Sequence, residues 1–215
     1  MATYYHPHLE VGGDYYDFIR LNDKEFAFCI ADVSGKGISA ALLMSNFQAN
    51  LRALFTPEIV LKRLINTLND RVVGITGGEK FITLFLAKYN YEKKELQYIN
   101  AGHNPPIHYD GDRKSLKYLK NGCIGLGMCD EIPSIRKGTV KITPGTKLLC
   151  YTDGLVEVEN ADQEEFSTGQ LEECLMSDHH INRIIENIIS RLDEHKGTSS
   201  YFDDISIIGI EFFQP

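Results

Sequence analysis

The sequence predicts an α+β fold in which antiparallel sheets are covered by helices grouped in pairs. Strand-like segments form hairpins at residues 15–31 and 81–100, each closed by a polar turn. Consecutive amphipathic segments follow at residues 38–73 and again at residues 168–192. Because single strands and single helices do not alternate, this order favours segregated layers over parallel β–α–β units. We expect one domain that covers residues 1–215.

The composition is that of a globular chain with an acidic surface. Hydrophobic residues make up 43% of the 215 positions and charged residues 24%, which is enough apolar sequence for a real core. The net charge of −8 argues against broad binding to nucleic acid or anionic membranes, which favour basic surfaces. No apolar run has the length of a membrane span, and the first residues lack a signal-peptide pattern. Structured sequence begins almost at once, so we expect a domain cut from a longer protein.

The cysteines indicate a reducing, cytoplasmic setting. They are odd in number, and no two have the CxxC spacing of a redox or zinc motif. Two of them lie in apolar runs, where a free thiol packs as a small hydrophobe. The five are Cys29, Cys123, Cys129, Cys150 and Cys174.

The first hairpin brings two carboxylates together. Tyr15–Leu21 and Glu25–Ala31 read as strands joined by an Asn-Asp turn, and the second strand is apolar enough to be buried on both faces. Asp14 precedes the first strand and Asp32 follows the second. The sequence therefore predicts that both carboxylates lie at the same end of the sheet.

Two helices are predicted after this hairpin. Ile38–Phe55 has helical spacing of apolar residues, and Thr56 with Pro57 reads as the N-cap and first residue of a second helix. Lys36 lies between two glycines, which resembles a phosphate-binding loop. The Walker pattern fails, however, because Ile30 stands where that loop needs glycine.

The rest of the chain predicts a second hairpin, short strands, two helices and a final strand. The isoleucine stripe of the last helix indicates core packing. The predicted hairpin strands are Phe81–Tyr89 and Glu95–Asn100, followed by strands at Pro106–Tyr109, Leu116–Leu119, Ile135–Ile142 and Lys147–Tyr151, helices at Thr168–Met176 and Ile181–Leu192, and a strand at Ile205–Phe213.

Four acidic positions at strand ends point to metal chemistry. Besides Asp14 and Asp32, Asp153 follows an apolar strand, and Asp203 and Asp204 lead into the final one. Any one of them alone reads as a solvated turn, but together they supply oxygen ligands, which Mg²⁺ and Mn²⁺ prefer. Without a cation, crowded carboxylates repel one another. The chain has no phosphocysteine signature and no Gly-x-Ser-x-Gly elbow, so water activated by two metals and hydrolysis of a phosphate ester are the favoured chemistry.

Five motifs in order then carry a family resemblance: VGGDYYDF, IADVSGKGISAALLM, INAGHNPP, PGTKLLCYTDGLVEVEN and FDDISIIGI. They resemble the bacterial stress-response and sporulation (SpoIIE/RsbU) branch of the metal-dependent PPM, or PP2C-like, serine/threonine phosphatases. The resemblance covers nearly the whole chain. It implies a PP2C-like αββα sandwich, in which two packed, mostly antiparallel sheets are flanked by helix pairs, with two Mn²⁺ or Mg²⁺ ions at one end.

The resemblance also implies roles for particular residues. Asp32 bridges both metals, and the backbone carbonyl of Val33 adds an oxygen ligand. Asp14 completes the shell of one ion, while Asp153 and Asp203 hold the other. Asp32 and Asp153 are the residues on which catalysis is expected to depend.

Some positions depart from the family pattern or leave alternatives open. Asp204 stands where the wider superfamily often has Asn, so we expect it to act from just outside the metals' direct ligands. Asp17 is an alternative to Asp14, and Asp17 or Asp204 can serve a third, weaker metal site. Ser34 replaces the His that is the proposed general acid of eukaryotic members, and no Arg lies near the first motif.

The loop with His103 and Asn104 has two interpretations. Its two following prolines are typical of a rigid turn. Alternatively, the loop faces the active site, and His103 and Asn104 help to bind the substrate phosphate.

The resemblance implies a regulatory protein phosphatase. Its expected substrate is a phosphoserine or phosphothreonine on an anti-sigma-factor antagonist, with an N-terminal sensor or partner protein, in cis or in trans, acting on the helices near residues 39–73. A homodimer is compatible with apolar surface left by a missing partner. The alternatives are a catalytically silent module that binds the phosphoprotein, for which loss of an Asp is expected and none is lost, and a nucleotide hydrolase, for which no base-binding signal exists.

Overall fold

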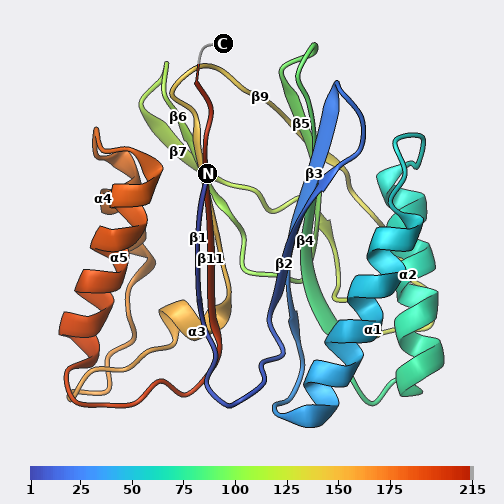
Figure 1. The fold of residues 1–215 in the computed structure, drawn as a ribbon, viewed down its shortest axis with the longest axis horizontal. Coiled ribbons are helices and arrows are strands. Elements are labelled where there is room, and N and C mark those ends of the chain that lie inside the picture. The colour runs from blue at the N-terminus through green and yellow to red at the C-terminus, as the bar shows by residue number, and fades with distance from the viewer. Residues whose placement is uncertain (214–215) are drawn as a thin grey trace.

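The computed structural model describes residues 1–213 as two stacked β-sheets with a helix pair on each outer face (Figure 1). The first sheet has the strand order β1-β11-β10-β6-β7, and the second has the order β2-β3-β4-β5-β8, with β9 also paired to β5. Every pairing is antiparallel except that of β5 with β8. The predicted α+β sandwich is confirmed.

The elements have these bounds. The strands are β1 (Ala2–His6), β2 (Tyr15–Arg20), β3 (Glu25–Val33), β4 (Ile82–Asn90), β5 (Glu95–Ala101), β6 (Ile107–Asp110), β7 (Ser115–Tyr118), β8 (Gly122–Cys123), β9 (Gly138–Lys141), β10 (Lys147–Tyr151) and β11 (Ile205–Glu211). The helices are α1 (Ile38–Leu54), α2 (Leu61–Thr76), α3 (Asp153–Val156), α4 (Thr168–Met176) and α5 (Ile181–Lys196).

Three apolar layers hold the sandwich together. One lies between the sheets and includes Phe28, Phe85 and Ile208. The other two lie between the second sheet and α1 with α2, and between the first sheet and α4 with α5 (Figure 1). The isoleucine stripe of α5 packs in the last of these layers, as its spacing predicts.

The second helix begins later than the sequence predicts. Thr56 and Pro57 do not cap α2; they lie in a turn in which the N–H of Ile59 donates to the Thr56 carbonyl at 3.2 Å. The Pro57 carbonyl accepts a hydrogen bond from Lys88 Nζ in β4 at 3.1 Å. This contact with the sheet outweighs the local capping signal, and α2 starts at Leu61 without a side-chain cap.

The N-terminal strand and the shortness of β9 were not predicted. β1 pairs along β11, with Ala2 opposite Gly209, so its partner lies at the other end of the chain. Only Gly138–Lys141 of the predicted strand at Ile135–Ile142 is in the sheet. No helix among residues 1–213 is long and apolar enough to cross a membrane. All five cysteines are free thiols, and the cytoplasmic setting stays a prediction.

Buried His108 predicts a loss of stability in acid. The residue is 1% exposed, neither ring nitrogen has a hydrogen-bond partner within residues 1–213, and burial, with a smaller effect of Lys117, lowers its pKa to about 4. The unfolded chain therefore gains this proton first, and stability falls as the pH drops from 6.5 towards 4. We expect His108→Phe to flatten the acid limb of Tm against pH, measured by thermal melts. Substitution of the exposed His179 by Phe is the control; acid limbs of equal slope in His108→Phe and wild type would contradict the prediction.

Candidate metal centre

The carboxylates named by the sequence meet at one end of the sandwich. β2 and β3 pair with Tyr15 opposite Ala31, so Asp14 and Asp32 occupy neighbouring strand ends. β10 and β11 pair with Tyr151 opposite Ile207, which carries the following Asp153 and the preceding acidic pair to the same end. We call Asp14, Asp32, Asp153, Asp203 and Asp204 the acidic centre.

Strand alternation directs Asp32 into the space between the sheets. In β3, Phe28 and Ile30 contact the layer between the sheets, whereas Ala31 and Val33 face α1 and α2. Asp32 shares the first face because successive side chains alternate. In β11, Ile208 and Ile210 face the same layer, which places Asp204 on that face too.

Burial and the neighbouring acids together raise the pKa values of three carboxylates of the acidic centre. Burial, reinforced by the charges of Asp153 and Asp203, raises the pKa of Asp32 to about 7. The pKa of Asp153 is also raised, first by burial and then by Asp203. Burial raises the pKa of Asp14 well above its usual value, although Thr152 Oγ1 donates a hydrogen bond to Asp14 Oδ2 at 2.8 Å. Such a group of acids gains from a bound cation, which removes the repulsion.

Asp204 braces the glycine loop of the first motif. Its two carboxylate oxygens accept hydrogen bonds from backbone N–H groups, Oδ1 from His8 at 2.7 Å and Oδ2 from Gly13 at 2.6 Å. Gly12 packs so closely here that a Cβ would lie 2.5 Å from Asp204 Oδ2. These bonds tie the segment before β2 to the segment before β11.

The donor set fits a hard cation. Among residues 1–213, no three His, Cys, Asp or Glu side chains converge into a ready-made metal site. Mg²⁺ keeps several waters and takes one or two carboxylates, so a wet site does not need three converging side chains. All five members of the acidic centre offer oxygen, and three have pKa values raised by burial.

Asp17 lies on the other face of β2, against α1. Arg52 of α1 donates to both of its oxygens at 2.6 Å, and the Tyr15 hydroxyl donates to Oδ2 at 2.5 Å. Burial alone would raise the pKa of Asp17, but the bonds from Arg52 and Tyr15 outweigh it and lower that pKa. The carboxylate therefore links α1 to the sheet, on the face away from the acidic centre.

Asp17→Asn is expected to weaken the fold and leave metal binding intact. Loss of the charged hydrogen bonds to Arg52 should cost about 1–3 kcal/mol of unfolding free energy, measured by urea denaturation. The Mn²⁺ concentration that gives half of the metal-induced shift in Tm should match wild type, because Asp17 faces α1. A several-fold increase in that concentration would instead make Asp17 a metal ligand.

The His103 loop lies next to the acidic centre. His103 Nδ1 is 2.8 Å from Thr83 Oγ1, and Thr83 pairs with Asp32 across β3 and β4. The ring is buried, which lowers its pKa to about 4, and its Nε2 has no partner within residues 1–213. Asn104 is partly exposed. The role of both residues in substrate binding stays a prediction.

The sequence did not indicate that two cationic side chains form ion pairs with Asp17 and Asp203. Arg52 reaches Asp17, and Lys36 Nζ lies 2.8 Å from Asp203 Oδ2. The glycines beside Lys36 were a signal, since they mark a shaped loop, but the sequence does not reveal its distant partner.

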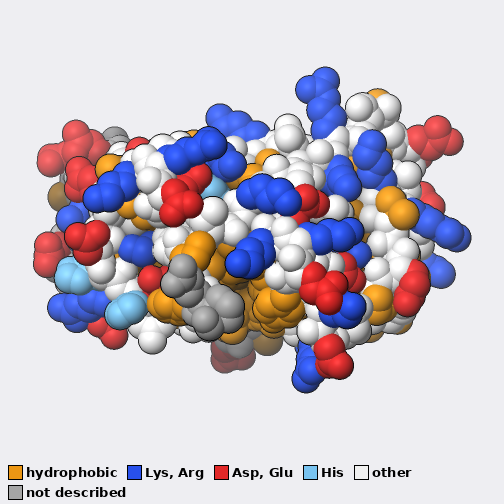
Figure 2. Space-filling model, turned by 90° about the horizontal axis from the view of Figure 1, so that it is seen from above, with side chains coloured by type: hydrophobic (Ala, Val, Ile, Leu, Met, Phe, Trp, Pro, Cys, Tyr) orange, Lys and Arg blue, Asp and Glu red, His pale blue; other side chains and the backbone are white. Residues whose placement is uncertain are grey.

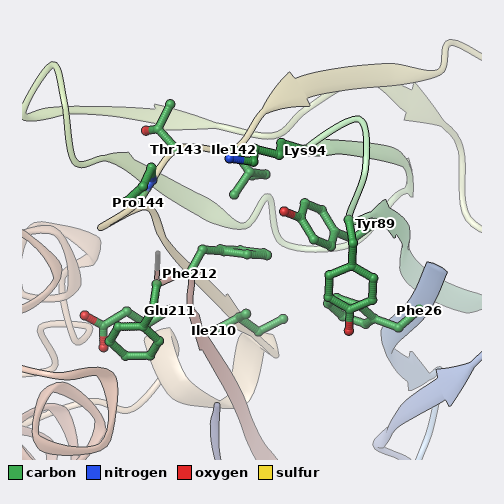
Figure 3. Close-up of a pocket in the computed structure, with 11 residues that line it drawn as sticks. Phe26, Tyr89, Lys94, Ile142, Thr143, Pro144, Ile210, Glu211 and Phe212 are labelled. Atoms are coloured by element: carbon green, nitrogen blue, oxygen red, sulfur yellow. The ribbon is translucent and has the colours of Figure 1, made fainter. Parts of the chain in front are cut away.

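A separate cavity lies at the opposite end of the sandwich. It has a volume of about 450 Å³, and its walls are mostly apolar, with the aromatic rings of Phe26, Tyr89 and Phe212 around it (Figure 3). Figure 2 shows that end of the molecule, where hydrophobic side chains are exposed among Lys, Arg, Asp and Glu. The cavity contains no member of the acidic centre.

The family model described as Stage II sporulation protein E (SpoIIE) matches residues 22–213. The chain belongs to the SpoIIE family. It falls in the branch of that family that includes RsbU, and its sandwich is PP2C-like. Protein IcfG from Synechocystis is 29% identical over 96% of this chain and 37% of its own length, and phosphoserine phosphatase RsbU from Bacillus subtilis is 29% identical over 87% and 57%. The chain therefore spans between about a third and three fifths of the length of these relatives.

Solved structures show the same fold. The SiaA-PP2C domain of Pseudomonas aeruginosa superposes on this SpoIIE-family domain with a TM-score of 0.85 at 19% identity, covering 98% of this chain and 85% of that one. RsbX in complex with magnesium gives a TM-score of 0.72 at 18% identity, covering 96% and 92%.

Proposed function

We propose that this domain hydrolyses phosphoserine or phosphothreonine on a protein substrate. The observation that carries the proposal is the acidic centre: five carboxylates from four chain segments meet at one end of a sandwich in a SpoIIE-family chain. Two Mn²⁺ or Mg²⁺ ions bound there would lower the pKa of a water molecule and polarise the phosphate. The magnesium complex of RsbX supports this choice of metal.

The position of each carboxylate supports a particular role in binding the two metal ions. Burial raises the pKa of Asp32, and the charges of Asp153, Asp203 and Asp204 raise it further, which supports a bridging role with the Val33 carbonyl beside it. Asp14, oriented by Thr152, would hold one ion. Asp153 and Asp203 would hold the second, which would relieve the repulsion between them.

Asp204 supports the metal site, because both of its oxygens already accept backbone hydrogen bonds. His103 and Asn104 are proposed to contact the substrate. The link from the His103 ring through Thr83 to the strand position of Asp32 supports a place beside the reacting phosphate.

The proposed substrate is a phosphorylated anti-sigma-factor antagonist, controlled by a sensor or partner protein in cis or in trans. The relatives extend beyond the part that this chain matches, which supports a regulatory segment outside the phosphatase domain. On α1, Ile38 is 73% exposed and Leu42 is 68% exposed, which supports a contact there with a partner or a second copy.

The direct test is phosphate release from a phosphoserine peptide as Mn²⁺ is titrated. We expect release that saturates with metal and disappears with a chelator. A domain that binds the phosphopeptide tightly at saturating Mn²⁺ but releases no phosphate would be a silent binding module, and the proposal would be wrong. Free nucleotides provide the control substrate, and faster turnover of them would also contradict it.

Metal binding is expected to stabilise the fold. A ligand at 100 times its Kd adds about 2.7 kcal/mol to the free energy of unfolding, so Mn²⁺ should raise Tm by several degrees and EDTA should reverse the rise. The reason is the repulsion among the buried acids of the metal-free centre. Asp153→Asn should show a smaller shift, and equal shifts in both proteins would place the metal elsewhere.

A further inference from the structure

Lys36 places a cation directly beside the acidic centre. Its Nζ lies 2.8 Å from Asp203 Oδ2 and also donates to the Phe202 carbonyl. Its charge acts on Asp153 as well, where it opposes the larger effects of burial and Asp203. Of the ion pairs formed within residues 1–213, this is the one made with a member of the acidic centre.

The loop around Lys36 is shaped by glycine. Gly35 has φ +87° and Gly37 has φ +76°, which is the left-handed region that favours glycine. Gly37 is the N-cap of α1, which has no side-chain cap and no acidic residue in its first turn. The positive end of that helix therefore adds to the attraction of this loop for an anion.

The ion pair of Lys36 is too exposed to be mainly a structural link. The side chains of Lys36 and Asp203 are 48% and 39% exposed, and pairs of this kind contribute little to stability. A lysine has a flexible stem and a compact charge, so its ammonium can move from Asp203 to a phosphate without leaving the centre. The geometry thus suits exchange between two anionic partners.

The net negative charge of the acidic centre favours a cationic side chain as a partner for the substrate phosphate. Five ionised carboxylates outweigh two divalent cations, so a phosphate dianion still meets negative charge at a fully loaded site. Ser34 stands beside the metal-bridging position and carries no charge. Arg52 is not available, because it binds Asp17 on the other face of the sheet.

We propose that Lys36 binds the phosphate group of the substrate; this rests on the proposed phosphatase function. In the structure its ammonium pairs with Asp203. When substrate is bound, the ammonium donates to a non-bridging phosphate oxygen at the same end of the sandwich. Lysine commonly binds phosphate in this way, as a point charge.

The first test compares the kinetics of Lys36→Gln, Lys36→Arg and Lys24→Gln at saturating Mn²⁺. Lys36→Gln should raise KM for a phosphoserine peptide, and the inhibition constant of inorganic phosphate, by about 10- to 100-fold, because a hydrogen bond between charged groups is lost. Lys36→Arg should recover most of that loss. Lys24 is the control, since it makes a 2.8 Å ion pair with Glu92 outside the acidic centre and its variant should behave as wild type.

The second test does not depend on turnover. Inorganic phosphate is titrated into the Mn²⁺-loaded protein by calorimetry, and Mn²⁺ into the metal-free protein. The proposal is supported if wild type binds phosphate and Lys36→Gln binds it at least tenfold more weakly. Lys36→Gln should also bind Mn²⁺ as tightly as wild type or more tightly. Equal phosphate binding in the two proteins, or none in wild type, overturns it. Weaker Mn²⁺ binding by Lys36→Gln also overturns it, because Lys36 would then position Asp203 for the metal. A wild type that binds phosphate but does not turn over would instead defeat the proposed function.

Discussion

Asp32→Asn is expected to abolish metal-dependent phosphate release while leaving the metal-free fold at least as stable as wild type. Asp32 is the carboxylate whose charge is coupled to Asp153, Asp203 and Asp204 together. Loss of a residue that merely supports a metal ligand costs 10- to 100-fold, so loss of the bridging ligand should reduce release by about 100-fold or more. Release from a phosphoserine peptide across a Mn²⁺ titration measures the effect.

The stability of the metal-free protein should not fall together with activity, because Asp32→Asn removes repulsion between carboxylates. Without metal, Asp32 is a half-buried acid beside like charges, and the amide of Asn has nearly the same shape without the charge. We therefore expect an equal or higher Tm for Asp32→Asn in EDTA, with a smaller rise on adding Mn²⁺. A Tm well below wild type would mean that inactivation comes from misfolding, not from a lost ligand.

Asp17→Asn provides the matched control for this experiment. It makes the same chemical change in the same hairpin, but on the face that packs against α1. It should lower stability and preserve the response to Mn²⁺, which is the reverse of the pattern for Asp32→Asn. Two substitutions with opposite effects separate the metal face of the sheet from its structural face.

The local sequence pattern was sufficient to predict those elements whose neighbours in sequence are also their neighbours in space. The hairpin of β2 and β3, with Asp14 and Asp32 at one end, follows from two apolar runs and a turn. The bounds of β10 and α4 match the predicted Lys147–Tyr151 and Thr168–Met176, because each is an apolar stretch with clear ends.

The local sequence pattern was insufficient where the role of a residue, or the bounds of an element, depend on a partner that is distant in the sequence. Nothing near Asp17 indicates that Arg52 will bind it, so sequence alone left Asp17 open as a metal ligand. The role of Asp204 depends on the N–H of Gly13, 191 residues away. The capping signal at Thr56 was overruled by the contact of Pro57 with Lys88, and β1 is a strand because β11 offers it an edge.

Gly154→Ala is expected to damage the acidic centre through the backbone. Gly154 follows Asp153 in α3, and a Cβ there would lie 2.1 Å from the Asp204 carbonyl oxygen and 3.2 Å from the Asp203 Cβ. Backbone atoms cannot rotate away as a side chain can, so the segments that carry these three acids must separate. We expect a loss of about 1–3 kcal/mol in unfolding free energy, measured by urea denaturation. Phosphate release should fall by about 100-fold, because small misplacements of catalytic groups have effects of that size.

Gly138→Ala separates overpacking in general from damage to the centre. A Cβ on Gly138 would also meet an atom at 2.1 Å, but that atom is Cζ of the Tyr98 ring, in the pairing of β9 with β5. This variant should lose comparable stability, yet its folded fraction should keep the wild-type response to Mn²⁺. If both variants lost activity only in proportion to their unfolded fraction, close packing of α3 on β11 would matter for stability alone. A loss specific to Gly154→Ala would show that the missing side chain at residue 154 lets Asp153 approach the two acids before β11.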